Sequence, residues 1–493
     1  MREIRPNQIN FGEIDISQIK FNPRSRDEMP QVLRGLQYIY ITPSIRQPVF
    51  ALLEKHILPE VSKKNGRPGM DLWQILVLGV VRLNLNWDYD RLEDEVNNHC
   101  KLREMLGHGD TFMPVRHEYS LQTLKDNVSL LTEELINEIN VLVVKAGHAL
   151  LKKKDPEMLE GRCDSFVLES NVHFPTDITL LFDALRKVMT LSARACMKQG
   201  SSSLRQNVYQ LRCLKNLLRV IQTRKHSRPK TPAAIEKKNA GVVKAHVAYL
   251  GLATTLLLKT VNALSELKIE EDEIEQYIVH AKRQMDQIER RVIKGEVIPH
   301  EEKVFSLFEP HTEWISKGKA GVPVELGLRV CILECASGFI LNHVVMQKQT
   351  DDQVAVEITR ETKKRFPGLR QVSYDKGFHS PENQKDLAEI LQSVVLPKKG
   401  KCSKARAEEE FSPAFKRARC QHSAVESAIN ALEVHGLDYC PDKGLDAFKC
   451  YVSLAVLSRN LQKTGAILQQ KTGLKDRRLK QRALNEALRL KAA

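Results

Sequence analysis

The sequence lacks several features that would indicate a membrane, secreted or nucleotide-using protein. It has no run of about 18 apolar residues, the length that a membrane-spanning helix needs. Its first residues, MREIRPNQINFGEID, contain no apolar core of a secretory leader. The phosphate-binding pattern GxxxxGK[ST] is absent. We therefore expect no membrane partner, no nucleotide cofactor and a cytoplasmic location.

Clustered cysteine is also missing. Of the ten cysteines, only Cys331 and Cys335 lie close together, and no second pair of metal ligands follows them. A zinc site is therefore not expected, and reduced thiols are the simplest interpretation.

Positive charge is abundant. The chain of 493 residues has 76 Lys and Arg against 61 Asp and Glu, a net charge of +15. Apolar residues make up 42% of the sequence, enough for well-packed cores in two to four domains. A basic chain of this kind favours a polyanionic partner such as nucleic acid.

The first 155 residues are predicted to be helical, after an irregular arm at 1–45. Asp71, followed by Gln74, has the capping pattern that opens a helix, and Asp88 is placed to cap another. Apolar residues then recur at intervals of three and four up to residue 155. This segment is predicted to be an all-α domain.

The apolar period changes after residue 155. Residues 162–174 are rich in β-branched and aromatic residues and predict a strand, and 178–298 predict a long helical insertion. Strands are predicted at 303–321, 325–336, 338–347 and 371–375, followed by helices and a further strand. A single helix is predicted from Ser412-Pro413 to Gly436. We expect an α/β core from 156–177 and 299–460, and a basic helical tail at 461–493.

Three acids stand in three different predicted elements of this core. Asp164 lies in the first strand, Asp375 ends a later strand at a Lys-Gly turn, and Glu426 lies on the late helix. Carboxylates are the ligands that Mg²⁺ prefers. Two ions, Mg²⁺ or Mn²⁺, held by these acids are suited to phosphodiester chemistry. The rival of Asp164 is Asp177, which is expected to cap the following helix, and Glu169 and Asp183 are weaker rivals that are expected to be solvated or capping.

Polar residues on the predicted late helix recur at helical spacing. Arg419, His422, Glu426 and Asn430 would share one face of it. This face is either an active-site face, with Arg419 and His422 on the scissile phosphate, or an ordinary solvated face.

Further residues are candidates for DNA contact. The basic loop before the late helix contains Lys398, Lys399, Lys401, Lys404 and Arg406, and it either contacts phosphates or is simply solvated. Trp314 could stack on an unpaired base, although a place in the core is the alternative that we favour. Residues 212–244 are also strongly basic.

Several stretches resemble one known family. They include PEVSKKNGRPGMDLWQILVLGVVRLNLNWDYD, CDSFVLESNVHFPTD, YDKGFHSPENQ and VESAINALEVHGLDYC, in order and spread over most of the chain. Together they resemble bacterial insertion-sequence transposases of the DDE class, most closely the ISNCY group. The order of elements is similar to an RNase H-like core, in which the first strand, the fourth strand and a late helix carry the three acids.

The resemblance implies a function. The helical N-terminal segment would bind the terminal inverted repeats of the element, and the core would cleave the ends and join them to target DNA. Asp164, Asp375 and Glu426 would be the catalytic and metal-binding acids. A homodimer or a larger synaptic complex on double-stranded DNA, near the bacterial nucleoid, would follow. The alternatives are a metal-dependent nuclease without strand transfer and a non-catalytic, transposase-derived DNA-binding protein.

One departure limits what can be carried over. Some related transposases have a Tyr and an Arg before the catalytic Glu and a Lys after it. The matching positions here are Arg419, His422 and Glu433. The contacts of that Tyr and that Lys therefore cannot be assigned to this chain.

Overall fold

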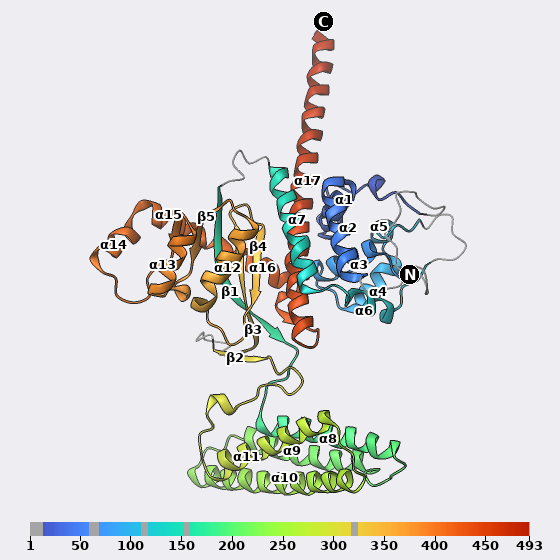
Figure 1. Ribbon diagram of the computed structural model, residues 1–493, viewed down its shortest axis with the longest axis vertical. Coiled ribbons are helices and arrows are strands. Elements are labelled where there is room, and N and C mark those ends of the chain that lie inside the picture. The colour runs from blue at the N-terminus through green and yellow to red at the C-terminus, as the bar shows by residue number, and fades with distance from the viewer. Residues whose placement is uncertain (1–12, 59–68, 110–116, 152–157, 317–323, 493) are drawn as a thin grey trace. The chain divides into compact units, whose positions relative to one another are not determined.

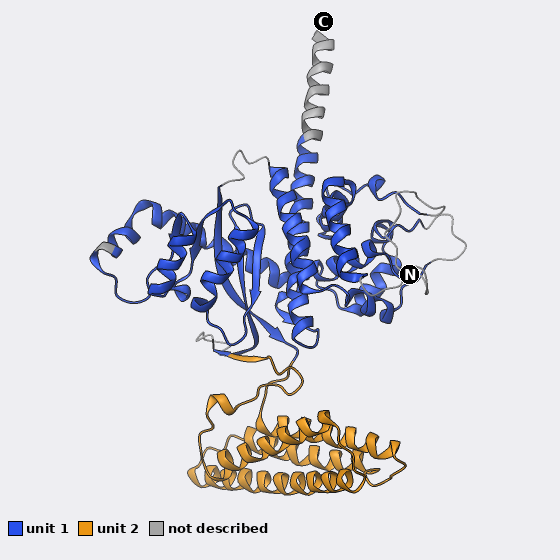
Figure 2. Cartoon of the chain, in the orientation of Figure 1, with its two compact units in different colours: residues 1–171, 315–493 blue, residues 172–314 orange. Residues whose placement is uncertain are grey.

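The computed structural model describes residues 13–58, 69–109, 117–151, 158–316 and 324–492. The chain folds into two compact units (Figure 2). Unit 1 contains residues 1–171 and 315–493, and unit 2 contains Val172–Trp314. Unit 2 includes the predicted helical insertion, with a few more residues at each end.

Unit 1 begins with helices, and the irregular arm predicted at 1–45 is wrong for 29–41, which form a helix, whereas 1–12 lie outside the described residues. The helices are α1 (Met29–Ile41), α2 (Pro43–Ile57), α3 (Leu72–Asn84), α4 (Tyr89–Asn98), α5 (Cys100–Met105), α6 (Leu121–Val128) and α7 (Glu133–Leu151), preceded by a short 3₁₀ turn at Ile16–Gln18. Both predicted caps are confirmed, because the Asp71 carboxylate accepts from the backbone N–H of Trp73 and that of Asp88 from Arg91. These bonds satisfy N–H groups that the first turn of a helix leaves free.

The sheet of unit 1 is mixed. Its strands are β1 (Leu159–Ser170), β2 (Glu313–Ser316), β3 (Val324–Cys335), β4 (Ile340–Val345), β5 (Leu369–Tyr374), β6 (Ser393–Val395) and β7 (Tyr439–Cys440). The order is β2-β3-β1-β5-β6, with β4 also on β3 and β7 on β1. β3 runs antiparallel to β1, whereas β5 runs parallel to it, and β6 runs parallel to β5. The strand predicted at 303–321 is confirmed for 313–316 and wrong for 303–312, which form turns and irregular loop, and 317–321 lie outside the described residues.

Helices cover both faces of this sheet (Figure 1). On one face, α12 (Asp351–Arg365) packs its Val354 and Ile358 into a cluster with Cys163 and Tyr374 of the sheet. On the other face, α16 (Ala424–Leu432) packs on β1. The remaining helices of the core are α13 (Pro381–Ile390), α14 (Lys404–Phe411) and α15 (Pro413–His422).

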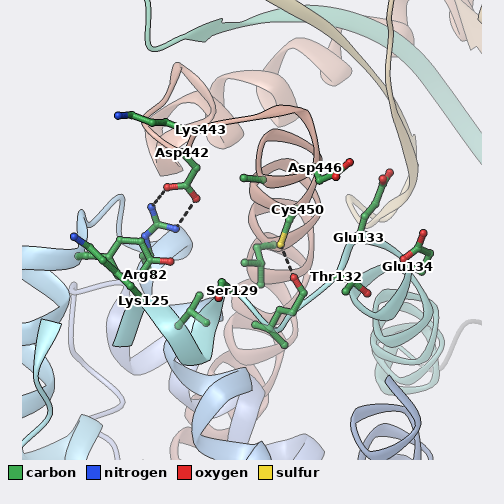
Figure 3. Close-up of a pocket in the computed structure, with 15 residues that line it drawn as sticks. Arg82, Lys125, Ser129, Thr132, Glu133, Glu134, Asp442, Lys443, Asp446 and Cys450 are labelled. Carbon is green, nitrogen blue, oxygen red and sulfur yellow. Dashed lines mark hydrogen bonds and ion pairs between the residues drawn. The ribbon is translucent and has the colours of Figure 1, made fainter. Parts of the chain in front are cut away.

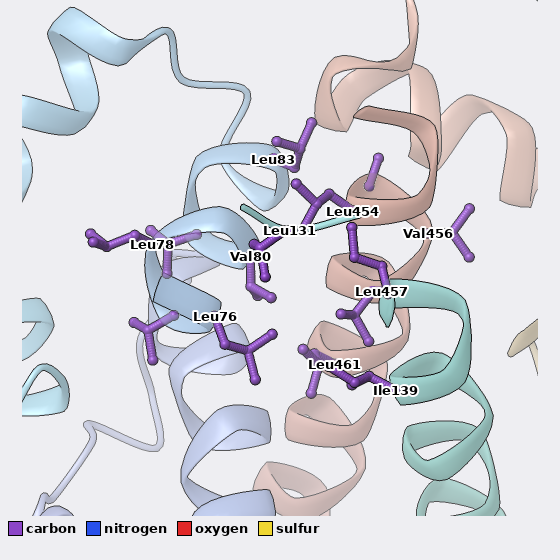
Figure 4. Packing of buried hydrophobic residues seen from close by; sticks show 14 of the residues in the cluster. Leu76, Leu78, Val80, Leu83, Leu131, Ile139, Leu454, Val456, Leu457 and Leu461 are labelled. Carbon is purple, nitrogen blue, oxygen red and sulfur yellow. The ribbon is translucent and has the colours of Figure 1, made fainter. Parts of the chain in front are cut away.

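The C-terminal helix α17 (Leu445–Ala492) joins the N-terminal helices to the sheet. Its buried residues belong to one cluster with side chains of α1, α3, α7 and the β1–β3 face, part of which is drawn in Figure 4. The predicted boundary at residue 461 therefore falls inside a continuous helix, and Leu461 itself is buried. The N-terminal helices and the core share this cluster instead of having separate cores.

An ion pair strengthens the same junction. Arg82 of α3 is 2% exposed, and its two terminal nitrogens donate to Asp442 at 2.9 and 2.6 Å (Figure 3). The Tyr89 ring centre lies 4.0 Å from the guanidinium. A pocket of about 620 Å³ borders the pair. Since Asp442 lies three residues before the first residue of α17, the pair fixes the start of that helix to α3.

Unit 2 is a helical bundle. It contains α8 (Asp177–Lys198), α9 (Asn207–His226), α10 (Pro232–Glu266) and α11 (Asp272–Ile288), followed by a π-helical turn at Glu289–Ile293 and a 3₁₀ turn at His300–Glu302. The four helices enclose a hydrophobic cluster of their own. By length and composition, α10 alone among the described helices could cross a membrane, although core helices of soluble proteins meet the same criterion.

Two glycines, Gly35 of α1 and Gly465 of α17, make the contact between these helices possible, and a Cβ at Gly35 would lie 2.2 Å from the carbonyl oxygen of Leu461. A Cβ at Gly465 of α17 would lie 1.8 Å from the carbonyl oxygen of Gln31, whereas a Cβ at Gly473, two turns further, would meet nothing within 4 Å. We predict that Gly465→Ala lowers the free energy of unfolding by about 2 kcal/mol or more, because the backbones must separate. Gly473→Ala is the matched control and should be neutral or raise it by up to about 1 kcal/mol. Urea denaturation of both variants measures the difference, and equal effects would contradict the packing described.

Candidate active site

The parallel pairing of β1 with β5 places the first two acids beside each other. Cys163 is the register partner of Tyr374, and Asp164 and Asp375 are the next residue on each chain. Neighbouring strands lie about 4.8 Å apart. Cys163 and Tyr374 are buried on the α12 face. Because successive side chains alternate between faces, Asp164 is directed to the opposite face, where α16 packs.

Glu426 reaches this face from α16. Val425, Ala428 and Leu432 of that helix are buried in the cluster that contains Phe166 and Leu168 of β1. Glu426 lies in the first turn and is exposed. A carboxylate in the first turn is favoured by the positive end of the helix dipole.

The single helix predicted at 412–436 is wrong. The chain forms α15, ends it at His422, and starts α16 at Ala424, with Ser423 between them. A positive φ of 104° at Gly436 accompanies the irregular turn that follows α16. His422 and Glu426 therefore belong to two consecutive helices, so their approach to the sheet does not depend on a shared helical face.

The charge of Asp164 depends on the other acids. Its pKa is raised to about 6, first because it is buried and then because Asp375, Asp351 and Glu426 add negative charge nearby. The backbone N–H of Ser165 donates to its carboxylate at 2.8 Å and partly opposes the shift. The three predicted acids therefore share one electrostatic environment. We call Asp164, Asp351, Asp375 and Glu426 the acidic group.

Asp351 is a member of this group that sequence reasoning missed. It is the first residue of α12, and its Oδ1 accepts a hydrogen bond of 2.6 Å from the Ser165 hydroxyl. A Cβ at Gly377 would lie 3.1 Å from its Oδ2. Asp351 thus contacts the residue after Asp164 and lies against the turn after Asp375. An Asp at the start of a helix is ordinary capping chemistry, so the sequence offered no reason to select it.

His422 lies at the edge of the acidic group. Its Nδ1 is 3.1 Å from the Ser373 hydroxyl on β5. Burial lowers the pKa of His422, while the charges of Asp375 and Glu426 oppose that shift. Arg162 also lowers it, and Arg162 is paired with Glu334 of β3 at 3.4 Å. The imidazole is thus within range of two of the predicted catalytic acids.

The basic residues predicted to bind DNA differ in their surroundings. Arg419, Lys399, Lys401 and Lys404 are exposed, and Lys398 is half-buried. Arg406 is 14% exposed, and its guanidinium pairs with Glu409 at 2.6 Å and Glu410 at 3.1 Å. It also donates to the carbonyl of Leu396. Arg406 therefore holds α14 against the end of β6, and its contact with DNA stays a prediction.

Trp314 belongs to unit 2. Its ring lies 5.5 Å from Phe174 and 5.6 Å from Phe305, centre to centre. The side chain is half-buried in this aromatic cluster. Packing of this kind is the alternative favoured from the sequence, although Phe174 remains 61% exposed.

The rivals of Asp164 have other partners or positions. Asp177 is the first residue of α8, behind the N-cap Thr176, and pairs with Arg291 at 2.7 Å. Asp183 pairs with Arg186 at 3.2 Å. Glu169 lies five residues along β1, on the opposite face from Asp164. The expected cap at Asp177 is thus wrong by one residue.

The donors of the acidic group suit a hard divalent cation. All four are carboxylates, and Mg²⁺ is bound by oxygen ligands. As the side chains stand, the described residues contain no group of three or more His, Cys, Asp or Glu that could hold a metal ion. The other three acids are therefore close enough to raise the pKa of Asp164, but the four carboxylates do not form a complete coordination shell for a metal ion. A cation among them would offset the repulsion that raises the pKa of Asp164.

Comparisons with known protein families, curated proteins and solved structures found no match to this chain. A functional assignment therefore rests on the chain's own residues and on the sequence resemblance given above.

The raised pKa of Asp164 predicts a pH-dependent stability. The folded pKa of about 6 exceeds the ordinary aspartate pKa of 3.8, so the stability that protonated Asp164 contributes is fully present below pH 3.8 and is lost as pH rises through 6. Asp164→Asn avoids that loss of stability, because an amide does not ionise as pH rises. Without divalent ions it should be more stable than the wild type at pH 7.5 by roughly 3 kcal/mol, but not at pH 3.5.

Thermal unfolding of both proteins across this pH range measures the effect. Adding Mg²⁺ at pH 7.5 should raise the Tm of the wild type and leave that of Asp164→Asn unchanged, because ligand binding to the folded state stabilises it. If the difference in stability between the wild type and Asp164→Asn does not vary with pH, the ionisation of Asp164 is not its cause and the prediction is contradicted.

Proposed function

We propose that this protein is a DNA transposase of the DDE class that cleaves the ends of its element and joins them to target DNA. The observation that carries the proposal is the placing of Asp164 and Asp375 side by side at adjacent parallel strands, with Glu426 in the same electrostatic environment. The sequence resemblance selected these same three acids. The net charge of +15 suits a DNA substrate.

The strand arrangement supports an RNase H-like interpretation of the core. With the short β2 set aside, the first acid lies on the first core strand and the second follows the fourth, which runs parallel to the first. The third lies on a late helix over the same face. This is the order that the resemblance implies.

Each residue has a stated role in the proposal. Asp164, Asp375 and Glu426 would hold two Mg²⁺ or Mn²⁺ ions, which supply charge stabilisation and a nucleophile at the scissile phosphodiester. His422, within range of Asp375 and Glu426, would face the phosphate. The exposed Arg419, Lys399, Lys401 and Lys404 would contact the DNA backbone, which positions the substrate without reading its sequence.

The reaction would need no covalent protein intermediate. The acids would position an activated water for the first cut, which leaves a 3′-OH on the element end. The same site would then direct that 3′-OH at target DNA. Catalysis of this kind comes from positioning and from charge stabilisation.

A cleavage assay tests the proposal. With labelled DNA carrying the element ends and Mg²⁺, the wild type should nick the ends and produce joined products. Asp375→Asn should lower both by a factor of ~10² or more, because a ligand for the cations is lost. Glu389→Gln, an exposed acid on α13, is the control and should keep full activity. Binding of the ends, measured by mobility shift, should be similar in all three.

The products separate the alternatives. Hydrolysed ends without joined product would indicate a nuclease, and binding without cleavage would indicate a DNA-binding protein. Cleavage retained by Asp375→Asn would refute the assignment of the acids.

Asp351 provides a second test of the site. We predict that Asp351→Asn lowers cleavage by ~10-fold or more, because it removes a negative charge beside Asp164 and weakens the support of the turn after Asp375. An amide can still accept the Ser165 hydrogen bond, so folding should be retained. Asp352→Asn, one residue further along α12, is the matched control. Equal activities of the two variants would exclude Asp351 from the site.

A further inference from the structure

One face of α10 in unit 2 is exposed and, between Lys244 and Lys259 near its two ends, carries no charged side chain. Val243, Val247, Gly251, Thr254 and Leu258 follow one another at intervals of three and four, which places them along one side of the helix. Val247 is 50% exposed and Leu258 is 58% exposed. The opposite side of the helix contributes Tyr249, Ala253 and Leu256 to the core of the bundle. We call the exposed side the outer face of α10.

The polar groups on the outer face are satisfied within the helix. The hydroxyl of Thr254 donates to the carbonyl of Leu250, and that of Thr255 to the carbonyl of Gly251, both at 2.9 Å. The hydroxyls thus need no partner from outside the helix. A Cβ at Gly251 would meet nothing within 4 Å. The middle of the face is therefore open and free of polar groups that need water.

The charges at the two ends of α10 are opposite. Between residues 224 and 240 there are six Lys and Arg and one Glu, whereas between 262 and 275 there are six Asp and Glu and one Lys. The centre of the outer face, near Gly251, lies midway between these two charged segments. A copy of the same helix turned end to end would thus meet each segment with the opposite charge.

We propose that the outer face of α10 is a self-association surface, on which a second copy of this chain packs its own α10 antiparallel, with the two-fold axis beside Gly251. Val243 would then lie opposite Leu258 of the partner subunit. The basic segment before the face would lie opposite the partner's acidic segment. An interface of this kind is isologous, as in most homodimers.

Charge favours this occupant over the others. A parallel pairing would bring like-charged segments together. DNA would meet the acidic segment at one end of the face, and that end would repel it. Insertion of α10 into a membrane would bury Lys259 in the bilayer. It would also bring the charged surface of the neighbouring helices into contact with lipid. Because Gly251 has no side chain, a second helix can approach α10 closely at this point, and packed helices normally lie 8–10 Å apart.

The outer face of α10 lies in unit 2 and includes none of the residues proposed for the reaction. It would also provide a surface for the dimer that synapsis of two DNA ends would need. A failure of self-association would leave the cleavage results unchanged, and inactive acids would leave self-association unchanged. The two proposals can therefore fail separately.

Sedimentation of the full chain at several concentrations tests the surface. The wild type should form a dimer. Val247→Glu should raise the dimer dissociation constant by ~10-fold or more, because it places a charge in the apolar contact. Val279→Glu on α11 introduces the same charge at a site that is 46% exposed and should leave it unchanged. Circular dichroism checks that both variants keep their helix content.

Cross-linking gives a test that does not depend on destabilising the surface. With the exposed Cys100, Cys402 and Cys420 replaced by Ser, Gly251→Cys should form a disulfide-linked dimer on mild oxidation. Val279→Cys should not. A monomeric wild type, an unchanged dimer in Val247→Glu, or equal cross-linking of both cysteine variants would overturn the proposal. So would flotation of the wild type, without a dimer, on vesicles of phosphatidylglycerol and phosphatidylethanolamine.

Discussion

The parallel register between β1 and β5 is the constraint on which the acidic group depends. These strands are more than 190 residues apart in sequence, and unit 2 is inserted between them. A shift of the register by one residue would move either acid to the other face of the sheet. The buried Cys163 and Tyr374 prevent that shift, because each would lose its place in the cluster beneath α12. Apolar burial on one face thus sets the position of the charges on the other.

The same reasoning explains how Glu426 is held. α16 is short, and its buried residues anchor it in the cluster that α17 shares with the N-terminal helices. The Arg82–Asp442 pair fixes the chain just before α17. Breaking such a pair would leave a buried charge without compensation, which is costly. The third acid therefore depends on contacts made by the first 151 residues, so the helical segment contributes to the site even without touching it.

The sequence predicted the local features well and the long-range ones less well. The helix caps at Asp71 and Asp88 follow from local chemistry, and the strand around Asp164 follows from β-branched composition. The role of Asp351 depends on its distance to Ser165, 186 residues earlier, which no local pattern encodes. The basic composition around Arg406 also gave no sign of its ion pairs with Glu409 and Glu410 on the same helix. The break at Ser423 likewise depends on how two helices fit the sheet.

The acidic group is a negatively charged site in a basic chain. Because of this, binding of its two proposed ligands, the divalent cations and the scissile phosphate, would be coupled. Burial first, and then the charges of the three other acids, raise the pKa of Asp164, and the four carboxylates together would repel a phosphodiester brought to the same place. Divalent cations at the acids would remove that repulsion, whereas the exposed lysines around α14 would attract DNA with or without cations. Binding of cations and binding of the scissile phosphate would therefore favour each other, and by linkage the coupling must be the same in both directions. On the proposed function, the chain would bind DNA through its basic surface first, and the acids would admit the reacting phosphate only when cations accompany it.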